Sequence, residues 1–151
     1  MQKIQTFLWY DNQAEEAAKF YTSIFKNSKI INTMPGPGGK PMGVTFELEG
    51  REYIAFNGGP HWKINGAISF FINCETQEEV DYYWEKLSAN GHKDRCGWLQ
   101  DQFGVSWQVV PTALGRLMGD KDPKKAGSVM QAMLTMSKLD IAGLQRAYDQ
   151  A

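Results

Sequence analysis

Two stretches of the chain share one pattern of hydrophobic and polar positions. A shift of 63 residues places FFINCETQEEVDYYWEKLS (70–88) over FLWYDNQAEEAAKFYTSIF (7–25) without a gap. Each copy begins with aromatic and aliphatic residues, passes through a polar turn, and continues with apolar residues at helical spacing. The helical stripes are Ala17, Phe20, Tyr21 and Ile24 in the first copy, and Val80, Tyr83, Trp84 and Leu87 in the second. The pattern predicts a strand followed by an amphipathic helix, twice.

Polar residues indicate where these two helices begin. Asp11 and Asn12 precede the first helix and Thr76 precedes the second, and their side chains can accept hydrogen bonds from free backbone N–H groups. Glu79 follows Thr76 at the spacing of a capping box. The pair Asn90-Gly91 is expected to end the second helix.

Further strands are expected after each helix, and further helices at the end of the chain. The expected strands, counting the two that open the copies, are 4–10, 29–33, 44–48, 52–56, 67–73, 93–98 and 105–110, with a hairpin turn at Glu49-Gly50-Arg51. The expected late helices are 113–118, 123–136 and 141–151. The order predicts one domain (1–151) of the α+β class: two βαβββ-type modules, 1–60 and 66–111, and a C-terminal helical extension, 112–151.

Composition narrows the class of protein. Hydrophobic residues make up 42% and charged residues 22% of the chain, as in soluble globular proteins. The formal charge of −1 gives no electrostatic reason to expect nucleic acid or a membrane as a partner. There is no apolar run of membrane-spanning length and no signal-peptide pattern, and the chain has two cysteines, so a cytoplasmic protein is expected. The aromatic content of 13%, with five Trp, suits a pocket for a flat or apolar ligand.

Four segments, which together span nearly the whole chain, carry a resemblance to a known family. They are AEEAAKFYTSIF (14–25), FNGGPHWKINGAISFFINCETQEEVDYYWEKLSANG (56–91), CGWLQDQFGVSWQVVP (96–111) and VMQAMLTMSKLDIAGLQRA (129–147). With the two modules, they resemble the vicinal oxygen chelate superfamily, which includes glyoxalase I and bleomycin-resistance proteins. Within it they are similar to the PhnB-like group, often labelled 3-demethylubiquinone-9 3-methyltransferase domains. The resemblance implies paired sheets around a U-shaped cavity, and a homodimer.

The resemblance also implies where a metal would be held. Metal-dependent members of the superfamily place one ligand on each of four strands, facing the cavity. These positions fall on Gln5, on Ile68 at the 63-residue repeat, on Gln108 after Gly104, and within one residue of Phe56. Two amides, an isoleucine and an aromatic ring lack the charge that zinc, nickel, manganese or iron sites use. We therefore expect a metal-free cavity and no cofactor.

The same placement predicts which side chains line the cavity. Side chains alternate along a strand, so Gln5, Phe7 and Trp9 share the cavity face, and a slip of one residue would exchange the two faces. Gln5 and Gln108 are expected to bond to each other, to water or to a polar ligand atom. Trp62, in the linker GGPHWKING, is a candidate rim residue or equally a packed linker anchor. The expected ligand-binding residues, or their immediate strand neighbours, are Gln5, Phe7, Trp9, Phe46, Phe56, Trp62, Phe70, Trp107 and Gln108.

The glycine-rich stretch MPGPGGKPMG (34–43) invites a phosphate-loop interpretation. It lacks the spacing GxxxxGK[ST], because Pro41 follows Lys40 and no helix begins there. A long hairpin loop is expected instead, and in this fold such a loop often lies beside the cavity or the dimer seam.

Other residues with reactive side chains have structural interpretations. Asp101 is expected to cap the turn that follows it, although it could also serve as a general base. His61 and His92 are expected to face solvent in loops. Cys74 and Cys96 are expected to be small buried side chains, because neither lies in a CxxC motif.

Together these observations favour a metal-independent protein that binds a small molecule in an aromatic cavity. One alternative is a metal-dependent enzyme of the glyoxalase or dioxygenase type, and another is a dimeric scaffold without a ligand. A third is a methyltransferase, as the family label says, although the glycine-rich strand–turn–helix of S-adenosylmethionine enzymes is not found. Whether the protein is an enzyme stays open, and no catalytic residue is assigned.

Overall fold

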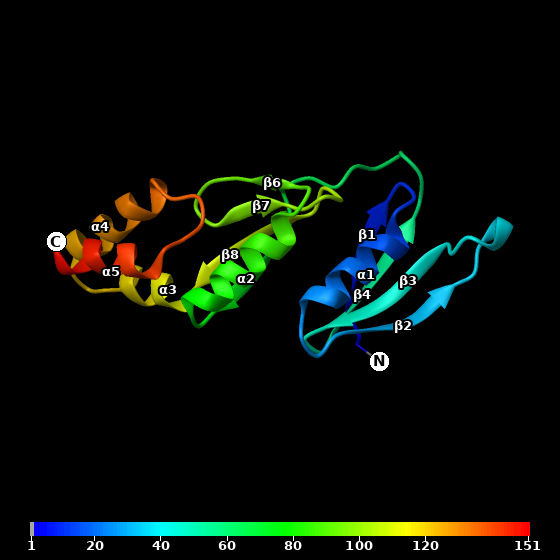
Figure 1. Ribbon diagram of the computed structural model, residues 1–151, viewed down its shortest axis with the longest axis horizontal. Coiled ribbons are helices and arrows are strands. Elements are labelled where there is room, and N and C mark those ends of the chain that lie inside the picture. The colour runs from blue at the N-terminus through cyan, green and yellow to red at the C-terminus, as the bar shows by residue number, and fades with distance from the viewer. Residues whose placement is uncertain (1) are drawn as a thin grey trace. The chain divides into compact units, whose positions relative to one another are not determined.

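The computed structural model describes residues 2–151, and the chain divides into two compact units. The first unit extends to Asn65, and the second runs from Gly66 to Ala151. Each unit contains a four-stranded mixed sheet with a helix between its first and second strands (Figure 1). The fold is α+β, as the sequence predicts.

The described residues of the first unit form one α-helix and one sheet. Its elements are β1 (Thr6–Tyr10), α1 (Ala14–Ile24), β2 (Lys29–Met34), a short 3-10 turn η1 (Pro37–Gly39), β3 (Gly43–Leu48) and β4 (Arg51–Asn57). The strand order is β1-β4-β3-β2, in which β1 and β4 are parallel and the other pairs are antiparallel. Glu49 and Gly50 form the β3–β4 turn with positive φ angles of 49° and 81°, which confirms the expected hairpin.

The second unit repeats this arrangement and adds the C-terminal helices. Its elements are β5 (Ser69–Cys74), α2 (Gln77–Ser88), β6 (His92–Lys93), β7 (Trp98–Gln100), β8 (Ser106–Pro111), α3 (Thr112–Met118), α4 (Pro123–Leu134) and α5 (Ile141–Asp149). The strand order is β5-β8-β7-β6. The single strand expected over 93–98 is wrong, because Cys96 and Gly97 have positive φ angles of 59° and 83° and turn the chain between β6 and β7.

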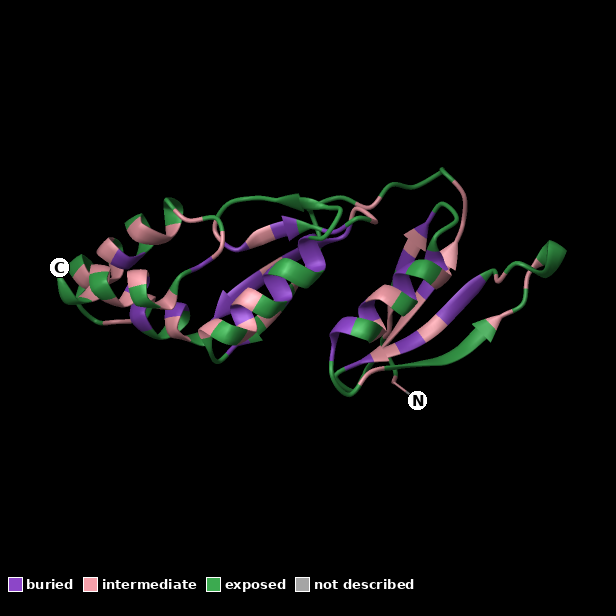
Figure 2. Cartoon of the chain, viewed as in Figure 1, coloured by how far each residue is buried: buried purple, intermediate pink, exposed green. Residues whose placement is uncertain are grey.

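Helix α1 covers one face of the first sheet. Its buried side includes Ala14, Ala17 and Ala18, whose small side chains let the helix lie close to the strands. Tyr21 of α1 packs against Phe46 of β3, with ring centroids 6.0 Å apart, and both side chains are fully buried. Figure 2 shows this buried layer in purple along α1 and the strand next to it. The core of the first unit therefore lies on the α1 side of its sheet.

The two helix starts differ from one another. At α2 the expected cap is confirmed: Thr76 Oγ1 accepts a hydrogen bond from Glu79 N at 3.2 Å. At α1 the expected cap by Asp11 or Asn12 is wrong. The N-cap residue is Gln13, and its side chain makes no capping bond. Asn12 lies one residue before the N-cap position, which is the position from which a side chain caps the first free N–H groups.

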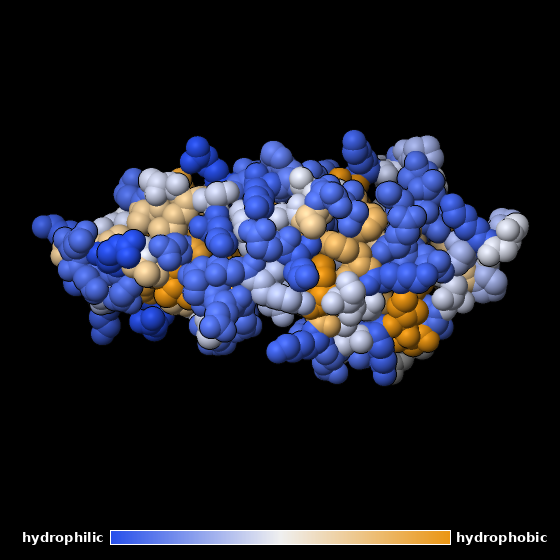
Figure 3. Space-filling view, viewed as in Figure 1, coloured by the Kyte–Doolittle hydropathy of each residue, from blue (hydrophilic) through white to orange (hydrophobic). Residues whose placement is uncertain are grey.

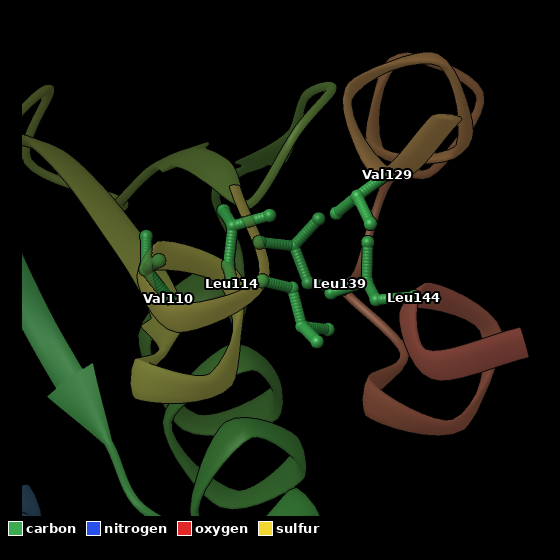
Figure 4. Packing of buried hydrophobic residues seen from close by; sticks show 6 residues of the cluster. Val110, Leu114, Val129, Leu139 and Leu144 are labelled. Carbon is green, nitrogen blue, oxygen red and sulfur yellow. The ribbon is translucent and has the colours of Figure 1, made fainter. Parts of the chain in front are cut away.

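The C-terminal helices share a hydrophobic core with strand β8. This cluster contains Val110, Leu114, Leu117, Val129, Leu139 and Leu144, and Figure 4 shows the side chains of β8, α3, α4 and α5 meeting in it. Backbone bonds from Cys96 N to Met136 O and from Gly97 N to Ser137 O, both 2.9 Å long, fix the α4–α5 connection to the turn before β7. The helical extension is therefore an integral part of the second unit.

The surface is mainly polar on the face drawn in Figure 3, with smaller hydrophobic areas between charged side chains. Across residues 2–151, no helix combines the length and the apolar character needed to cross a membrane.

Candidate functional site

Three aromatic side chains gather on the face of the first sheet that α1 leaves uncovered. Phe7 and Trp9 on β1 alternate with buried Leu8 and Tyr10, so they point away from the helix. The parallel register places Phe56 of β4 beside Trp9. Ring centroids lie 5.3 Å apart for Phe7 and Phe56, and 5.4 Å apart for Trp9 and Phe56. Phe7 is 52% exposed, so this aromatic surface is open to a ligand or a partner.

A pocket of about 490 Å³ lies at the end of this surface. Trp9 and Phe56 form its aromatic wall, and Pro37, Pro41 and Met42 of the β2–β3 loop contribute a second apolar wall. The remaining lining residues are Asn12, Lys40, Asn57 and Gly58. The pocket is therefore largely apolar, with a few polar groups and one cationic residue in its lining.

The sequence Gly58-Gly59 holds Trp9 in place. The Trp9 indole Nε1 donates a hydrogen bond to Gly59 O at 2.9 Å. A Cβ atom at position 58 would overlap the Trp9 ring, so this position requires glycine. The indole is thus oriented by the backbone that follows β4.

The β2–β3 loop forms the other side of the pocket, and it confirms the hairpin loop expected for residues 34–43. Gly38 and Gly39 have positive φ angles of 72° and 75°, which glycine adopts more readily than residues with a side chain. The loop closes through a hydrogen bond from Met42 N to Met34 O at 2.8 Å. The connection between two antiparallel strands therefore has a defined conformation beside Trp9.

Gln5 and Gln108 each have a partner inside their own unit. Gln5 Nε2 donates to Glu52 Oε1 at 2.8 Å, and Gln108 Nε2 donates to Ser69 Oγ at 3.0 Å. The sequence pointed to both amides but not to Glu52 or Ser69, whose positions follow only from the strand pairing.

The strand faces in the second unit differ from the expected ones by one residue. Phe71 is 53% exposed and pairs with Gln108, whereas Phe70 contacts Trp107, which is only 3% exposed. The prediction that Phe70 and Trp107 share the face of Gln108 is therefore wrong, because neighbouring residues of a strand point to opposite faces. Ser69 and Phe71, the strand neighbours of Phe70, lie on the face of Gln108 instead.

This shift has a local cause. Three residues join β1 to α1, but only two join β5 to α2. The helices therefore repeat at 63 residues, while the buried strand ends Tyr10 and Cys74 repeat at 64. Ser69, and not Ile68, is the counterpart of Gln5, and Ile68 precedes β5 with 73% of its surface exposed.

Two other expected site residues lie elsewhere. Phe46 is fully buried and stacks on Tyr53 at 5.4 Å, on the face covered by α1. Its expected place on the aromatic surface is wrong, because β3 presents Thr45 and Glu47 on that side. Trp62 is 63% exposed in the segment after β4, and its ring meets His61 edge-on at 4.7 Å.

The residues at the expected ligand positions do not fit a metal centre. In the first unit they supply the amide of Gln5, the ring of Phe56 and one carboxylate, Glu52, which is bonded to Gln5. In the second unit they supply the amide of Gln108 and the hydroxyl of Ser69. Zinc, manganese and iron sites rely on several His, Cys or carboxylate ligands. Within residues 2–151, no group of three such side chains could hold a metal ion.

Asp101 has the structural role that the sequence predicts, and a further bond. The buried carboxylate accepts hydrogen bonds from Phe103 N at 2.9 Å and Val105 N at 3.0 Å. It also accepts one from Trp107 Nε1 at 2.8 Å, which the sequence did not indicate. Asp101 therefore fixes the β7–β8 turn to the core of the second unit.

The remaining candidate side chains are two histidines and two cysteines. His61 and His92 are exposed, although His92 belongs to the short strand β6 and not to a loop. Cys74 and Cys96 are free thiols, and Cys96 is only half-buried. Burial, together with the nearby charge of Glu79, raises the pKa of the Cys74 thiol to about 12. Cys74 is therefore a protonated core residue at neutral pH.

Comparisons with known structures define the class of protein. The putative 3-demethylubiquinone-9 3-methyltransferase, PhnB protein, from Bacillus cereus is 33% identical, with a TM-score of 0.69 over 74% of this chain and 100% of that one. Protein PA1353 from Pseudomonas aeruginosa is 18% identical, with a TM-score of 0.61 over 74% and 98% of the two chains. The fosfomycin resistance protein FosX from Listeria monocytogenes, solved with Mn(II) and sulfate, is 17% identical, with a TM-score of 0.53 over 71% and 90%. The fold is that of the glyoxalase, or vicinal oxygen chelate, superfamily.

A family model gives the narrower assignment. The model described as 3-demethylubiquinone-9 3-methyltransferase matches residues 2–110, so the chain belongs to this PhnB-like family. No curated protein matches the chain. The matched region ends in β8, and helices α3, α4 and α5 lie beyond it.

Proposed function

We propose that the protein binds a small aromatic or apolar molecule, without a metal, at the aromatic surface of its first unit. The observation that carries this proposal is the pocket of about 490 Å³ walled by Trp9 and Phe56. Small-molecule sites typically measure about 300–1,000 Å³ and combine apolar walls with a few polar groups. Flat rings also gain favourable contacts with aromatic side chains.

The metal-independent part of the proposal is supported by donor chemistry. The amides of Gln5 and Gln108 and the hydroxyl of Ser69 are neutral, and each amide donates a hydrogen bond to a neighbouring side chain. Elemental analysis of protein purified without chelator tests this part. Stoichiometric zinc, nickel, manganese or iron that is lost in Gln108→Ala would overturn it.

Methyl transfer, which the family description names, is not what we propose. The S-adenosylmethionine enzymes of the common type bind their cofactor at a glycine-rich turn between a strand and a helix. Here the β1–α1 turn is Asp11-Asn12-Gln13, and Gly58-Gly59 leads into a turn at Pro60-His61 and not into a helix. These turns do not fit that cofactor.

We include a homodimer and a cytoplasmic location in the proposal. The dimer is supported by exposed apolar side chains on the first sheet, namely Phe7, Ile30 and Ile31, of which the last two belong to the edge strand β2. Two free thiols are compatible with a reducing compartment. Light scattering at micromolar concentration that gives a monomer mass would overturn the dimer.

Binding of a neutral aromatic probe tests the proposed site. We expect 2-naphthamide to bind saturably by calorimetry, and Trp9→Ala to weaken binding about tenfold or more through the loss of apolar contact area. Gly58→Ala should have a similar effect, because its methyl group displaces the Trp9 indole. Trp62→Ala is the matched control, since it removes an exposed Trp that does not line the pocket. No saturable binding, or equal loss in the control, would contradict the proposal.

A further inference from the structure

The aromatic pocket carries a single charge. Of the described residues that line it, Lys40 alone is charged, and the others are apolar or neutral. Lys40 is exposed and makes no ion pair within residues 2–151, whereas Lys19, Lys93 and Lys138 each lie beside a carboxylate. Its ammonium group is therefore available to a ligand in the pocket.

The β2–β3 loop is built to hold Lys40 at this position. Gly36 lies against the backbone of the residues that follow: an added Cβ would come within 2.6 Å of Lys40 O and 3.0 Å of Met42 N. Pro37 and Pro41 restrict the backbone at both ends of the turn. Asn57 Nδ2 donates to Pro41 O at 2.9 Å and joins the residue after Lys40 to strand β4. The lysine thus belongs to a fixed turn against the wall of the pocket.

We propose that this pocket selects flat, apolar ligands that carry a negative charge, and that Lys40 recognises the charge. The proposal rests on the proposed function and adds the charge of the ligand and the residue that reads it. The aromatic wall of Trp9 and Phe56 suits a ring system, and the ammonium group of Lys40 suits a carboxylate or a similar anion at the edge of that ring. A neutral ligand of the same shape gains only the apolar contacts.

A pair of matched probes tests this inference. Calorimetry compares 2-naphthoate with 2-naphthamide, which share the ring system and differ in charge. We expect naphthoate to bind about three- to fivefold more tightly, the upper part of the range of an exposed ion pair, and the advantage to shrink in high salt. In Lys40→Gln the two probes should bind equally. Lys26→Gln is the control, because it removes an exposed lysine that does not line the pocket, and it should keep the preference.

The outcomes separate this inference from the proposed function. Equal binding of both probes to the wild type, or a preference that survives Lys40→Gln, overturns the inference and leaves the aromatic site standing. If neither probe binds, both the inference and the proposed function are overturned. Lys40→Gln is shown to be folded if it still binds naphthamide and its unfolding midpoint is unchanged. If such a folded variant has lost the preference for naphthoate, the inference is supported.

Discussion

Asn57, the last residue of strand β4, caps helix α1: its Oδ1 accepts a hydrogen bond from Ala14 N at 2.8 Å. The same side chain donates from Nδ2 to Pro41 O at 2.9 Å. One amide therefore joins the start of α1, the end of β4 and the loop that carries Lys40. The end of β4 and this loop both line the pocket, so its shape depends on Asn57.

Substitutions at Asn57 should separate the two bonds. Asn57→Ala loses both and should lower the free energy of unfolding by about 1–2 kcal/mol, the usual effect of losing an N-cap. Asn57→Asp keeps an acceptor for Ala14 N but loses the donor to Pro41 O, so it should affect stability less while weakening naphthoate binding. Urea unfolding and calorimetry measure the two effects. Equal stability of Asn57→Ala and the wild type would contradict the capping role. Asn12→Ala is the control, because it removes another asparagine that lines the pocket.

Asp101 should be one of the most sensitive polar residues of the second unit. Asp101→Ala leaves the N–H groups of Phe103, Val105 and Trp107 without their acceptor, and should cost about 2–4 kcal/mol of unfolding free energy. Asp101→Asn should cost less, because an amide oxygen still accepts bonds, but its NH₂ group conflicts with at least one donor. Asp94→Asn, at an exposed position, is the control. Urea unfolding that places Asp101→Ala within 0.5 kcal/mol of the wild type, about the size of an ordinary surface substitution, would refute this.

The helices and the order of the elements could be predicted from the sequence because their signals are local. Apolar residues such as Ala17 and Tyr21, or Val80 and Trp84, recur at helical spacing, and burial on one side of a helix requires that spacing. The fold class follows from the same repeat. Thr76 could be identified as a cap because its bond reaches only three residues ahead.

The site could be predicted only in part, because it depends on strand faces and on distant contacts. Phe70 and Phe71 are both aromatic, so the sequence does not show which one faces the core. The difference of one residue between the β1–α1 and β5–α2 connections decides it. Asn57 serves Ala14, 43 residues away, and no local pattern signals such a pair.

Cys74 should make stability depend on pH in the alkaline range. Its pKa in the folded protein is about 12, above the ordinary value of 9.0, because the buried thiolate is disfavoured. The unfolded chain therefore loses this proton first, and the stability present below pH 9 is lost as the pH rises toward 12. Cys74→Ala should show a shallower loss of unfolding free energy with pH than Cys96→Ala. With a thiol reagent at pH 8, Cys96 should react before Cys74, and equal rates would contradict the prediction.

Gln77, the first residue of α2, should control the docking of the C-terminal helices. Its Oε1 accepts from Ile141 N at 2.8 Å, and its Nε2 donates to Leu139 O at 3.1 Å. Gln77→Ala leaves both backbone groups unpaired, so local opening of α4 and α5 should become easier by about 1–3 kcal/mol. Hydrogen exchange should show faster exchange in α4 and α5 and unchanged exchange in strands β1 to β4, which belong to the other unit.

A neighbouring ion pair gives this prediction a second test. Lys138 Nζ lies 3.0 Å from Asp81 Oδ1, and the bonds from Gln77 and Lys138 hold the pKa of Asp81 below its usual value. A lowered pKa stabilises the folded form above about pH 4, and this contribution is lost as the pH falls through the folded-state pKa. Exchange in α4 and α5 should therefore rise in acid more steeply for the wild type than for Asp81→Asn. Gln145→Ala removes a bond within α5 and should leave docking intact, because Gln145 Nε2 donates to Asp149 of the same helix. If Gln77→Ala and Gln145→Ala accelerate exchange equally, the docking bonds of Gln77 do not hold the extension, and the hydrophobic cluster around Leu139 alone does so.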